Sequence, residues 1–327
     1  MVAAGWELAR RTVTLLFMRL RTVIAAAILA AGTLVTTPAS ADNVEPGCHE
    51  TIAGYTCFHG PYDVGPEGLE LTALADAPPE AGYITDARAT LVGKDGDPVS
   101  IHKVHLHHGV WINPEAEDIT CSASPGDRFF ATGKERTAMD LPAGHGYYWA
   151  NEGVDGFPWN GVPQWGMTAH LDGMHGSGQD NVYIRLRLGF TTDDLIPITP
   201  VWVDVNGSCT QDVTFDVPKS TDGRNRFRIS APLDMPASGD FIGMGGHLHD
   251  GGIRLKLKNH TTDERTFVSK AIYDKHDRWF LEEMTSFYGL PGKSVAQGDD
   301  LELTAVYNST RKWDDAMGIM MLALVQD

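Results

Sequence analysis

Histidines at metal-ligand spacing are the side chains of this sequence best suited to chemistry. One pair, His247 and His249, lies in the glycine-rich stretch GMGGHLHDGG. Residues i and i+2 of a strand point to the same face, so both neutral imidazoles can reach one ion. The flanking glycines remove side-chain bulk and let the backbone bend around such a site. The spacing predicts a metal site, although a His-x-His pair also occurs on ordinary half-exposed strands.

A second group of histidines lies in IHKVHLHHGVW. The adjacent residues His107 and His108 would point to opposite faces of a regular strand, so they can share one ion only at a bulge or a strand end. Gly109, which follows them, would permit such a distortion. His105 and His107 share a face without distortion, so either pair is a candidate, and His105 could replace one member of the adjacent pair.

Met317 and His170 complete the candidate ligands. Imidazole together with thioether is a soft donor set that suits Cu(I), whereas zinc more usually takes His with Cys or carboxylate. A methionine beside Met320 and Met321 is also an ordinary core residue. Asp250 is expected either to orient a ligand imidazole or to serve in a turn. The remaining clustered histidines are expected in loops or as partners of ligands: His102, His145 and His175.

The elements that carry these residues are predicted to be strands. Strict alternation of apolar and polar residues, the pattern of a half-buried strand, occurs in residues 182–188, 253–258 and 301–307. Clusters of Gly, Pro, Asn and Asp in residues 93–98, 236–240 and 291–293 predict turns between such segments. Many short strands without helical periodicity favour an all-β sandwich.

The chain is expected to contain two β-sandwich domains after an export signal. Residues 196–200, IPITP, resemble a linker, which predicts an N-terminal domain over 42–200 and a C-terminal domain over 201–327. Arg19 and Arg21 precede an apolar run over 23–35, and Ala-Ser-Ala over 39–41 supplies a cleavage site. Because the apolar run is too short to span a membrane, residues 1–41 are predicted to be a signal peptide and not a membrane anchor. Met18 is an alternative start of the chain.

Charge and cysteine content agree with a secreted protein that is free of the membrane after cleavage. The predicted signal contains four Arg and one Glu, so its removal changes the net charge from −17 to −20. Such an acidic protein repels nucleic acid and anionic lipid. All four cysteines follow the signal. The short separation of Cys48 and Cys57 makes them the first disulfide, and Cys121–Cys209 follows by elimination.

Together, the pair, the single histidine, the His-x-His and the methionine resemble the copper type II, ascorbate-dependent monooxygenases. That family includes peptidylglycine α-hydroxylating and dopamine β-monooxygenases, and its members have two jelly-roll-like β-sandwich domains. His170 lies 62 residues after His108, and Met317 lies 70 residues after His247, separations similar to the family's. The chain would be a divergent member, and its glycine-rich stretch also looks like that of proteins related to stress-up-regulated nodulins.

The resemblance implies two copper ions, with ascorbate as the reductant and O2 and a small molecule as substrates. His247, His249 and Met317 would form the catalytic site. His107, His108 and His170 would form an electron-transfer site that faces it across a wet cleft. Where peptide-amidating members have an Arg, Asn and Tyr that contact substrate, this chain has Gly245, Ile319 and Met321. The substrate is therefore expected to be small or neutral, and not a glycine-extended peptide.

Two other classes of function compete with this interpretation. A non-catalytic extracellular copper-binding protein could keep the fold and one metal site. A metal-free β-sandwich that binds carbohydrate or protein could use a platform of tryptophans, for which the candidates are Trp111, Trp149, Trp159 and Trp165. Copper content and ascorbate-driven oxygen uptake separate the three classes.

Overall fold

The computed structural model describes residues 43–327 except 135, 153–161 and 211. The predicted signal peptide and Trp159 therefore lie outside the described residues. Residues 43–327 form one compact unit, which is built of strands and one short 3-10 helix, η1 (Met174–Gly176). Among the described residues, no helix has the length and apolarity needed to cross a membrane.

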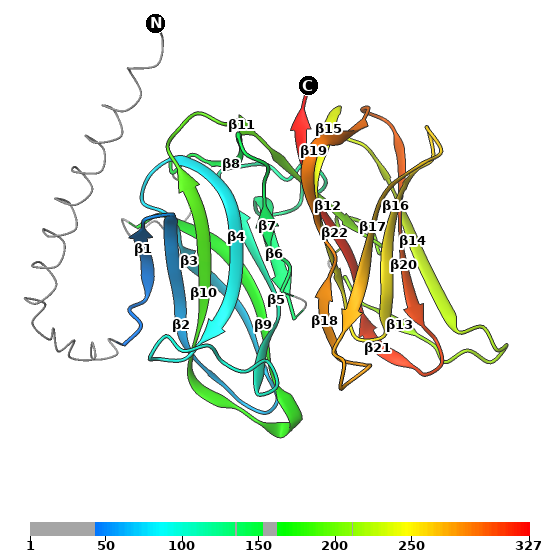
Figure 1. Ribbon diagram of the computed structural model, residues 1–327, viewed down its shortest axis with the longest axis horizontal. Coiled ribbons are helices and arrows are strands. Elements are labelled where there is room, and N and C mark those ends of the chain that lie inside the picture. Colours follow the sequence, from blue (N-terminus) through cyan, green and yellow to red (C-terminus); the bar gives the residue numbers. More distant parts are fainter. Residues whose placement is uncertain (1–42, 135, 153–161, 211) are drawn as a thin grey trace, which may run out of the picture. The chain divides into compact units, whose positions relative to one another are not determined.

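Strands from the first part of the chain form two sheets (Figure 1, blue to green). The larger sheet has the order β1 (Gly47–Thr51), β2 (Gly54–Val64), β10 (Gln179–Thr191), β4 (Gly82–Val92), β8 (His145–Trp149) and β11 (Ile196–Pro197), with β7 (Met139–Asp140) also on β4. The smaller has the order β3 (Leu69–Asp76), β9 (Gln164–Gly173), β5 (Val104–Asn113) and β6 (Asp127–Gly133). Apolar side chains from both sheets form one buried core, as in a β-sandwich.

Strands from the later part form three further sheets. One has the order β12 (Thr199–Asp204), β22 (Gly318–Gln326), β15 (Gly239–Leu248) and β19 (Phe287–Val295). Another has the order β14 (Arg226–Asp234), β20 (Asp300–Asn308), β16 (Gly252–Asn259), β17 (Glu264–Tyr273) and β18 (Leu281–Met284). A short pair joins β13 (Phe215–Val217) to β21 (Trp313–Ala316). A second core lies between the two larger of these sheets.

The predicted all-β sandwich fold is confirmed. The three alternating segments lie within β10, β16 and β20, and in β10 the apolar Leu186 and Leu188 are buried while Arg187 between them is exposed. Among the described strands, partners change between β11 and β12, near residue 198. The division into two domains stays a prediction.

One predicted turn is wrong. Residues 291–293, Pro-Gly-Lys, lie inside β19, which continues to Val295. The pairing of β19 with β15 is irregular between Phe241 and Gly243, so the strand accommodates the proline and glycine in a bulge instead of ending there. Residues 93–98 do lie between strands, where Gly96 adopts a positive φ of 77°.

Both predicted disulfides, Cys48–Cys57 and Cys121–Cys209, are present. The first joins paired positions of β1 and β2. The second joins the segment before β6 to the segment after β12 and closes a separation of 88 residues. Two disulfides are consistent with an extracellular protein, because disulfides persist in oxidising compartments.

Candidate metal centre

A β-bulge brings His107 and His108 to the same region. On β5, Leu106 pairs with Leu171 of β9, whereas His108 pairs with His170, so His107 is the extra residue. A bulge redirects a side chain that would otherwise point to the opposite face. Of the two arrangements that the sequence leaves open, the adjacent pair at a bulge is therefore the one present.

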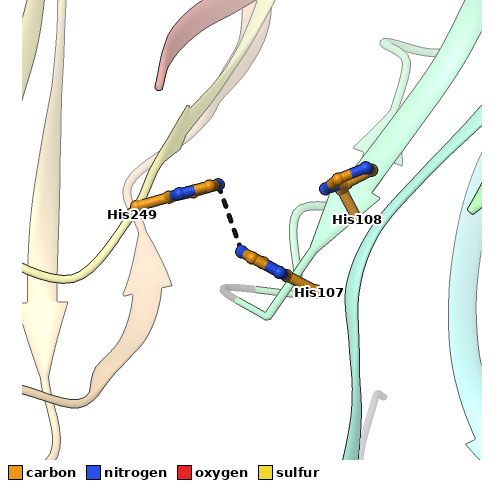
Figure 2. Close-up of side chains that lie close together, drawn as sticks. All are labelled: His107, His108 and His249. Carbon is orange, nitrogen blue, oxygen red and sulfur yellow. Dashed lines mark hydrogen bonds between the residues drawn. The ribbon is translucent and has the colours of Figure 1, made fainter. Parts of the chain in front are cut away.

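His107 lies at the centre of a cluster of imidazoles. Its Nδ1 is 3.1 Å from Nδ1 of His170, and its Nε2 is 3.2 Å from Nε2 of His249. Figure 2 shows His249 directed across the gap between strands toward His107, with His108 beside it. At metal–nitrogen bonds of about 2.05 Å, two ligands of a tetrahedral ion lie ~3.3 Å apart. Each observed spacing is close to that of two ligands of one ion, but the two spacings involve opposite nitrogens of His107, so a single ion does not account for both.

The structure groups the predicted ligands differently from the two sets that the resemblance implies. Potential ligand atoms of His107, His108 and His249 lie within 4.8 Å of one another, and so do those of His107, His170 and Asp172. Among the described residues, His108 and His170 do not share such a group; their ring centroids are 5.5 Å apart. Instead of facing each other across solvent, the two predicted sets meet where His107 contacts His249.

His247 and Met317 lie on the side of the cluster that faces an apolar cavity. The ring centroids of His247 and His249 are 5.1 Å apart. On β15, His247 pairs with Ile319 of β22, and Met317 directly precedes that strand. His108, His247 and Met317 all line a cavity of about 230 Å³. Met317 therefore borders the same cavity as His108, which belongs to one predicted ligand set, and His247, which belongs to the other.

Tyr307 of β20 joins the backbones that carry His249 and Met317. Its hydroxyl accepts a hydrogen bond from the His249 N–H at 2.9 Å and donates one to the Met317 carbonyl at 2.5 Å. The tyrosine is completely buried, so no water competes for these groups. The hydroxyl thereby fixes the relative positions of a predicted histidine ligand and the predicted methionine ligand.

Asp172 is a member of the cluster that the sequence did not single out. Its carboxylate lies 3.3 Å from His105 Nε2, 3.1 Å from His107 Nδ1 and 2.9 Å from His170 Nε2. Burial raises its pKa, but the hydrogen bonds from these three histidines outweigh burial and lower it strongly. A signal was available, because Asp172 follows His170 by two residues on β9 and so shares its face.

The environment keeps three of the central imidazoles neutral. Burial lowers the pKa of His107, lowers that of His108 to about 3, and lowers that of His249 well below its usual value. His170 differs, because its hydrogen bond to Asp172 raises its pKa. Neutral imidazoles are the form that binds metal, and a thioether such as that of Met317, which lines the adjoining cavity, would favour copper. The residues present therefore fit the predicted copper.

Other predicted roles around the cluster are confirmed in part: Asp250 lies in a turn, which was one of its two expected roles. His105 is buried and contacts Asp172, so it joins the cluster through the carboxylate. Asp250 does not orient an imidazole through its Oδ1, which accepts hydrogen bonds from Lys134 Nζ and the Leu281 N–H. His102 is exposed in the turn before β5, as expected, whereas His145 begins strand β8 and its Nδ1 lies 3.3 Å from the Ala143 carbonyl. The side chain of His175 lies outside the described residues.

The tryptophan platform expected for a carbohydrate-binding protein is not formed by its described members. Trp111, Trp149 and Trp165 are completely buried in the first core. Trp149 and Trp165 pack edge to face, with ring centroids 5.4 Å apart. Side chains that are inaccessible in this way cannot stack on a sugar, so these three act in core packing.

The comparisons with known proteins agree with a copper site. No protein-family model matches the chain. The chain is 27% identical over 271 residues to the "Probable copper-dependent oxygenase M1" of Phoma sp., covering 77% of this chain and 65% of that protein. It is 28% identical over 223 residues to the "Probable copper-dependent oxygenase clz3" of Cochliobolus lunatus, covering 63% and 64%. The chain thus spans slightly under two thirds of the length of these relatives, and the similarity supports a protein of the copper-oxygenase kind.

Proposed function

We propose that this protein is a secreted, copper-dependent monooxygenase that hydroxylates a small neutral substrate with O2 and ascorbate. The observation that carries the proposal is the contact of neutral histidines from both predicted sets beside an apolar cavity that Met317 lines. The overall reaction converts R–H, O2, two electrons and two protons to R–OH and water, and ascorbate would supply the electrons. Copper, when bound, would supply the one-electron redox chemistry that activates O2.

We assign the ligands as the sequence predicted them. His247, His249 and Met317 would hold the copper at which the substrate reacts. His107, His108 and His170 would hold the copper that transfers electrons. The direct His107–His249 contact gives electrons a short path between the two sets. Asp172 would hold His107 and His170 in position, as carboxylates commonly orient histidine ligands.

Other residues of the chain serve the reaction without touching copper. Tyr307 would keep the His249 and Met317 backbones at a fixed spacing. The apolar walls of the cavity would exclude bulk water from the reacting carbon, which limits wasteful reduction of O2. Gly245, Ile319 and Met321, the positions where peptide-amidating members have polar contacts to substrate, all line this cavity. They support a neutral substrate in place of a peptide carboxylate.

Copper stoichiometry and oxygen uptake test the proposal. We expect two copper ions per chain and ascorbate-dependent oxygen consumption. His247→Ala and His107→Ala should each lower copper content, whereas His276→Ala, which removes an exposed histidine, should not. One redox-silent copper per chain would favour the non-catalytic copper-binding protein. Unchanged copper content in His247→Ala would refute the assignment of the reacting site.

A further inference from the structure

The apolar cavity beside the histidines has the size of a small organic molecule. Its volume is about 230 Å³, which corresponds to ~8 waters at about 30 Å³ each. It lies between two sheets, with β5, β6 and β9 on one side and β12, β15 and β22 on the other. A cavity between packed sheets that is partly open to solvent is a usual place for a ligand.

The residue pattern of β22 separates the cavity from the core. Ile319 and Met321 line the cavity, whereas Met320 and Leu322, which alternate with them, are buried in the second core. Gly245 of β15 also lines the cavity, and a Cβ placed there would come within 2.7 Å of Thr137 Cγ2. The absence of a side chain at Gly245 therefore leaves room for the Thr137 side chain, which packs against it in this wall.

Apart from the imidazoles, two hydrogen-bonding groups in the cavity wall have no partner among the described residues. They are Trp202 Nε1 of β12 and Thr132 Oγ1 of β6. The two residues are 6% and 4% exposed, and both line the cavity. Buried donors without partners are unusual and costly. A ligand oxygen that accepts from either group would remove this cost, so the wall specifies an acceptor within an otherwise apolar ligand.

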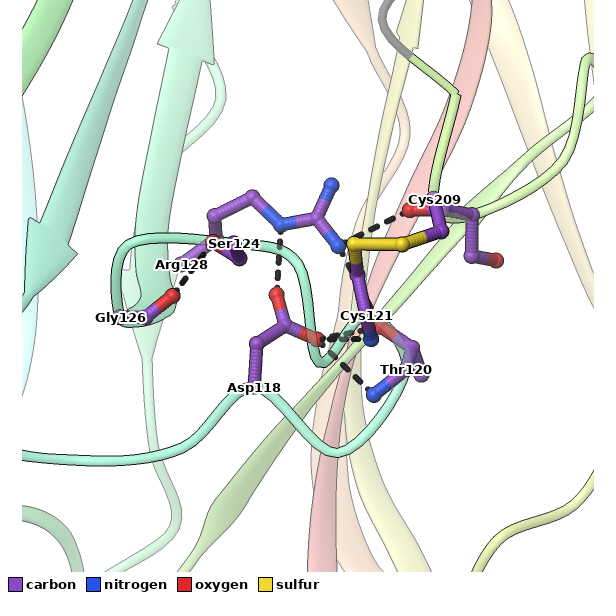
Figure 3. A network of polar contacts seen from close by, with 8 residues as sticks. Asp118, Thr120, Cys121, Ser124, Gly126, Arg128 and Cys209 are labelled. Atoms are coloured by element: carbon purple, nitrogen blue, oxygen red, sulfur yellow. Dashed lines mark hydrogen bonds and ion pairs between the residues drawn. A yellow bond between two sulfur atoms is a disulfide. The ribbon is translucent and has the colours of Figure 1, made fainter.

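Among the described residues that line the cavity, the permanently charged cation is Arg128, and it is already neutralised. Arg128 Nε donates to Asp118 Oδ2 at 2.6 Å, and Nη2 donates to the Ser208 carbonyl at 3.0 Å. Figure 3 shows this arginine held beside the Cys121–Cys209 disulfide, with Asp118 against its guanidinium. Its guanidinium carbon also lies 4.5 Å from the centre of the Trp202 ring. Because the Asp118 carboxylate already pairs with this guanidinium, the cavity offers an anion no uncompensated positive charge and does not favour one.

We propose that this cavity binds a neutral, apolar molecule that carries one hydrogen-bond acceptor oxygen, held by Trp202 N–H and Thr132 O–H. The assignment of this molecule as the substrate rests on the proposed function, because His108, His247 and Met317 line the same cavity. Binding of the molecule itself requires no copper.

Three naphthalenes of matched shape test the proposal by calorimetric titration of the copper-loaded and the metal-free protein. They are 2-acetylnaphthalene, which has an acceptor oxygen; 2-ethylnaphthalene, which has none; and the anion 2-naphthoate. One hydrogen bond changes affinity by roughly fivefold to tenfold, so the ketone should bind more tightly than the hydrocarbon by about that factor. The naphthoate should bind most weakly.

Variants locate the binding and identify its donors. Trp202→Phe and Thr132→Val should each reduce the preference for the ketone by roughly threefold or more. Trp279→Phe, a matched control outside the cavity lining, should keep the preference. Ile319→Trp should fill the cavity and abolish binding of all three probes, with thermal unfolding used to check that each variant is folded.

Several results would overturn the proposal. These are equal affinity for the ketone and the hydrocarbon, tightest binding of naphthoate, no binding of any probe, a preference that survives in both donor variants, or binding that survives Ile319→Trp. The outcome is separable from that of the proposed function. Probe binding in a protein that takes up no copper would leave this proposal standing, and a copper oxygenase that binds none of the probes would contradict only this proposal.

Discussion

Replacing Asp172 by Asn should weaken copper binding although this residue is outside both predicted ligand sets. The carboxylate contacts three imidazoles, at 3.3, 3.1 and 2.9 Å. An amide is neutral, and its nitrogen is a donor, so it can accept from fewer of these rings. The ring orientations of His107 and His170 would then no longer be fixed together.

The magnitude follows from the role of such carboxylates. Loss of a group that orients histidine ligands typically lowers metal affinity by about 10–100-fold, which is ~1.4–2.8 kcal/mol. Because Asp172 contacts His107 and His170, which are both assigned to the predicted electron-transfer copper, we expect the weakening at that copper. The other copper should keep most of its affinity.

Competition with a chromophoric Cu(I) chelator measures both affinities in one titration. Asp172→Asn should change one of two binding steps, and Asp95→Asn, which alters an exposed carboxylate in the turn over 93–98, should change neither. A folded Asp172→Asn protein with two unaltered binding steps would refute the role given to this carboxylate. Equal weakening of both steps would refute the separation of the two sets.

Three further changes have defined outcomes. Tyr307→Phe should destabilise the fold by about 1–3 kcal/mol in urea unfolding, because it leaves two buried backbone groups without their partner. Asp127 is buried, and burial raises its pKa from 3.8 to about 8. Its contribution to stability is therefore complete below about pH 4 and is lost as the pH rises to about 8, with a slope of up to ~1.4 kcal/mol per pH unit, and Asp127→Asn should abolish this slope in thermal unfolding. Replacing Cys121 and Cys209 by Ala should cost about 4–5 kcal/mol for a loop of 88 residues, against ~2.5 kcal/mol for the disulfide with a separation of 9.

Each of these outcomes can be contradicted separately. A Tyr307→Phe protein as stable as the parent would mean that water or a rearrangement satisfies both backbone groups. An unchanged pH slope in Asp127→Asn would assign the slope to another buried carboxyl, such as Asp204, whose pKa burial raises to about 6. Equal losses on removing either disulfide would show that loop length does not set their contributions.

The sequence predicts local features of this protein well because they depend on neighbouring residues. Alternation over 182–188 correctly predicts the strand that becomes β10. The glycine after His108 permits a bulge, and one is present. The turn predicted over 291–293 is wrong because pairing with β15 carries β19 through it. The residues of a segment alone do not show how much a neighbouring paired strand stabilises it.

Sequence patterns do not predict those features of the site that depend on contacts between residues far apart in the chain. His107 and His249 are 142 residues apart in the chain and 3.2 Å apart at their ring nitrogens. No periodicity encodes that contact. Asp172 was different, because its position two residues after His170 was a usable signal. The apolar cavity was anticipated only in part, from Gly245, Ile319 and Met321, since its opposite wall comes from β5 and β6.

X-ray absorption at the copper edge of the ascorbate-reduced protein tests the central claim most directly. The thioether of Met317 should appear as a sulfur scatterer beside the imidazole nitrogens. The sulfur signal should disappear in Met317→Ile and persist in Met320→Ile, whose methionine is buried in the second core. Copper that shows only nitrogen neighbours in the parent, or sulfur that persists in Met317→Ile, would contradict the assignment of the reacting site.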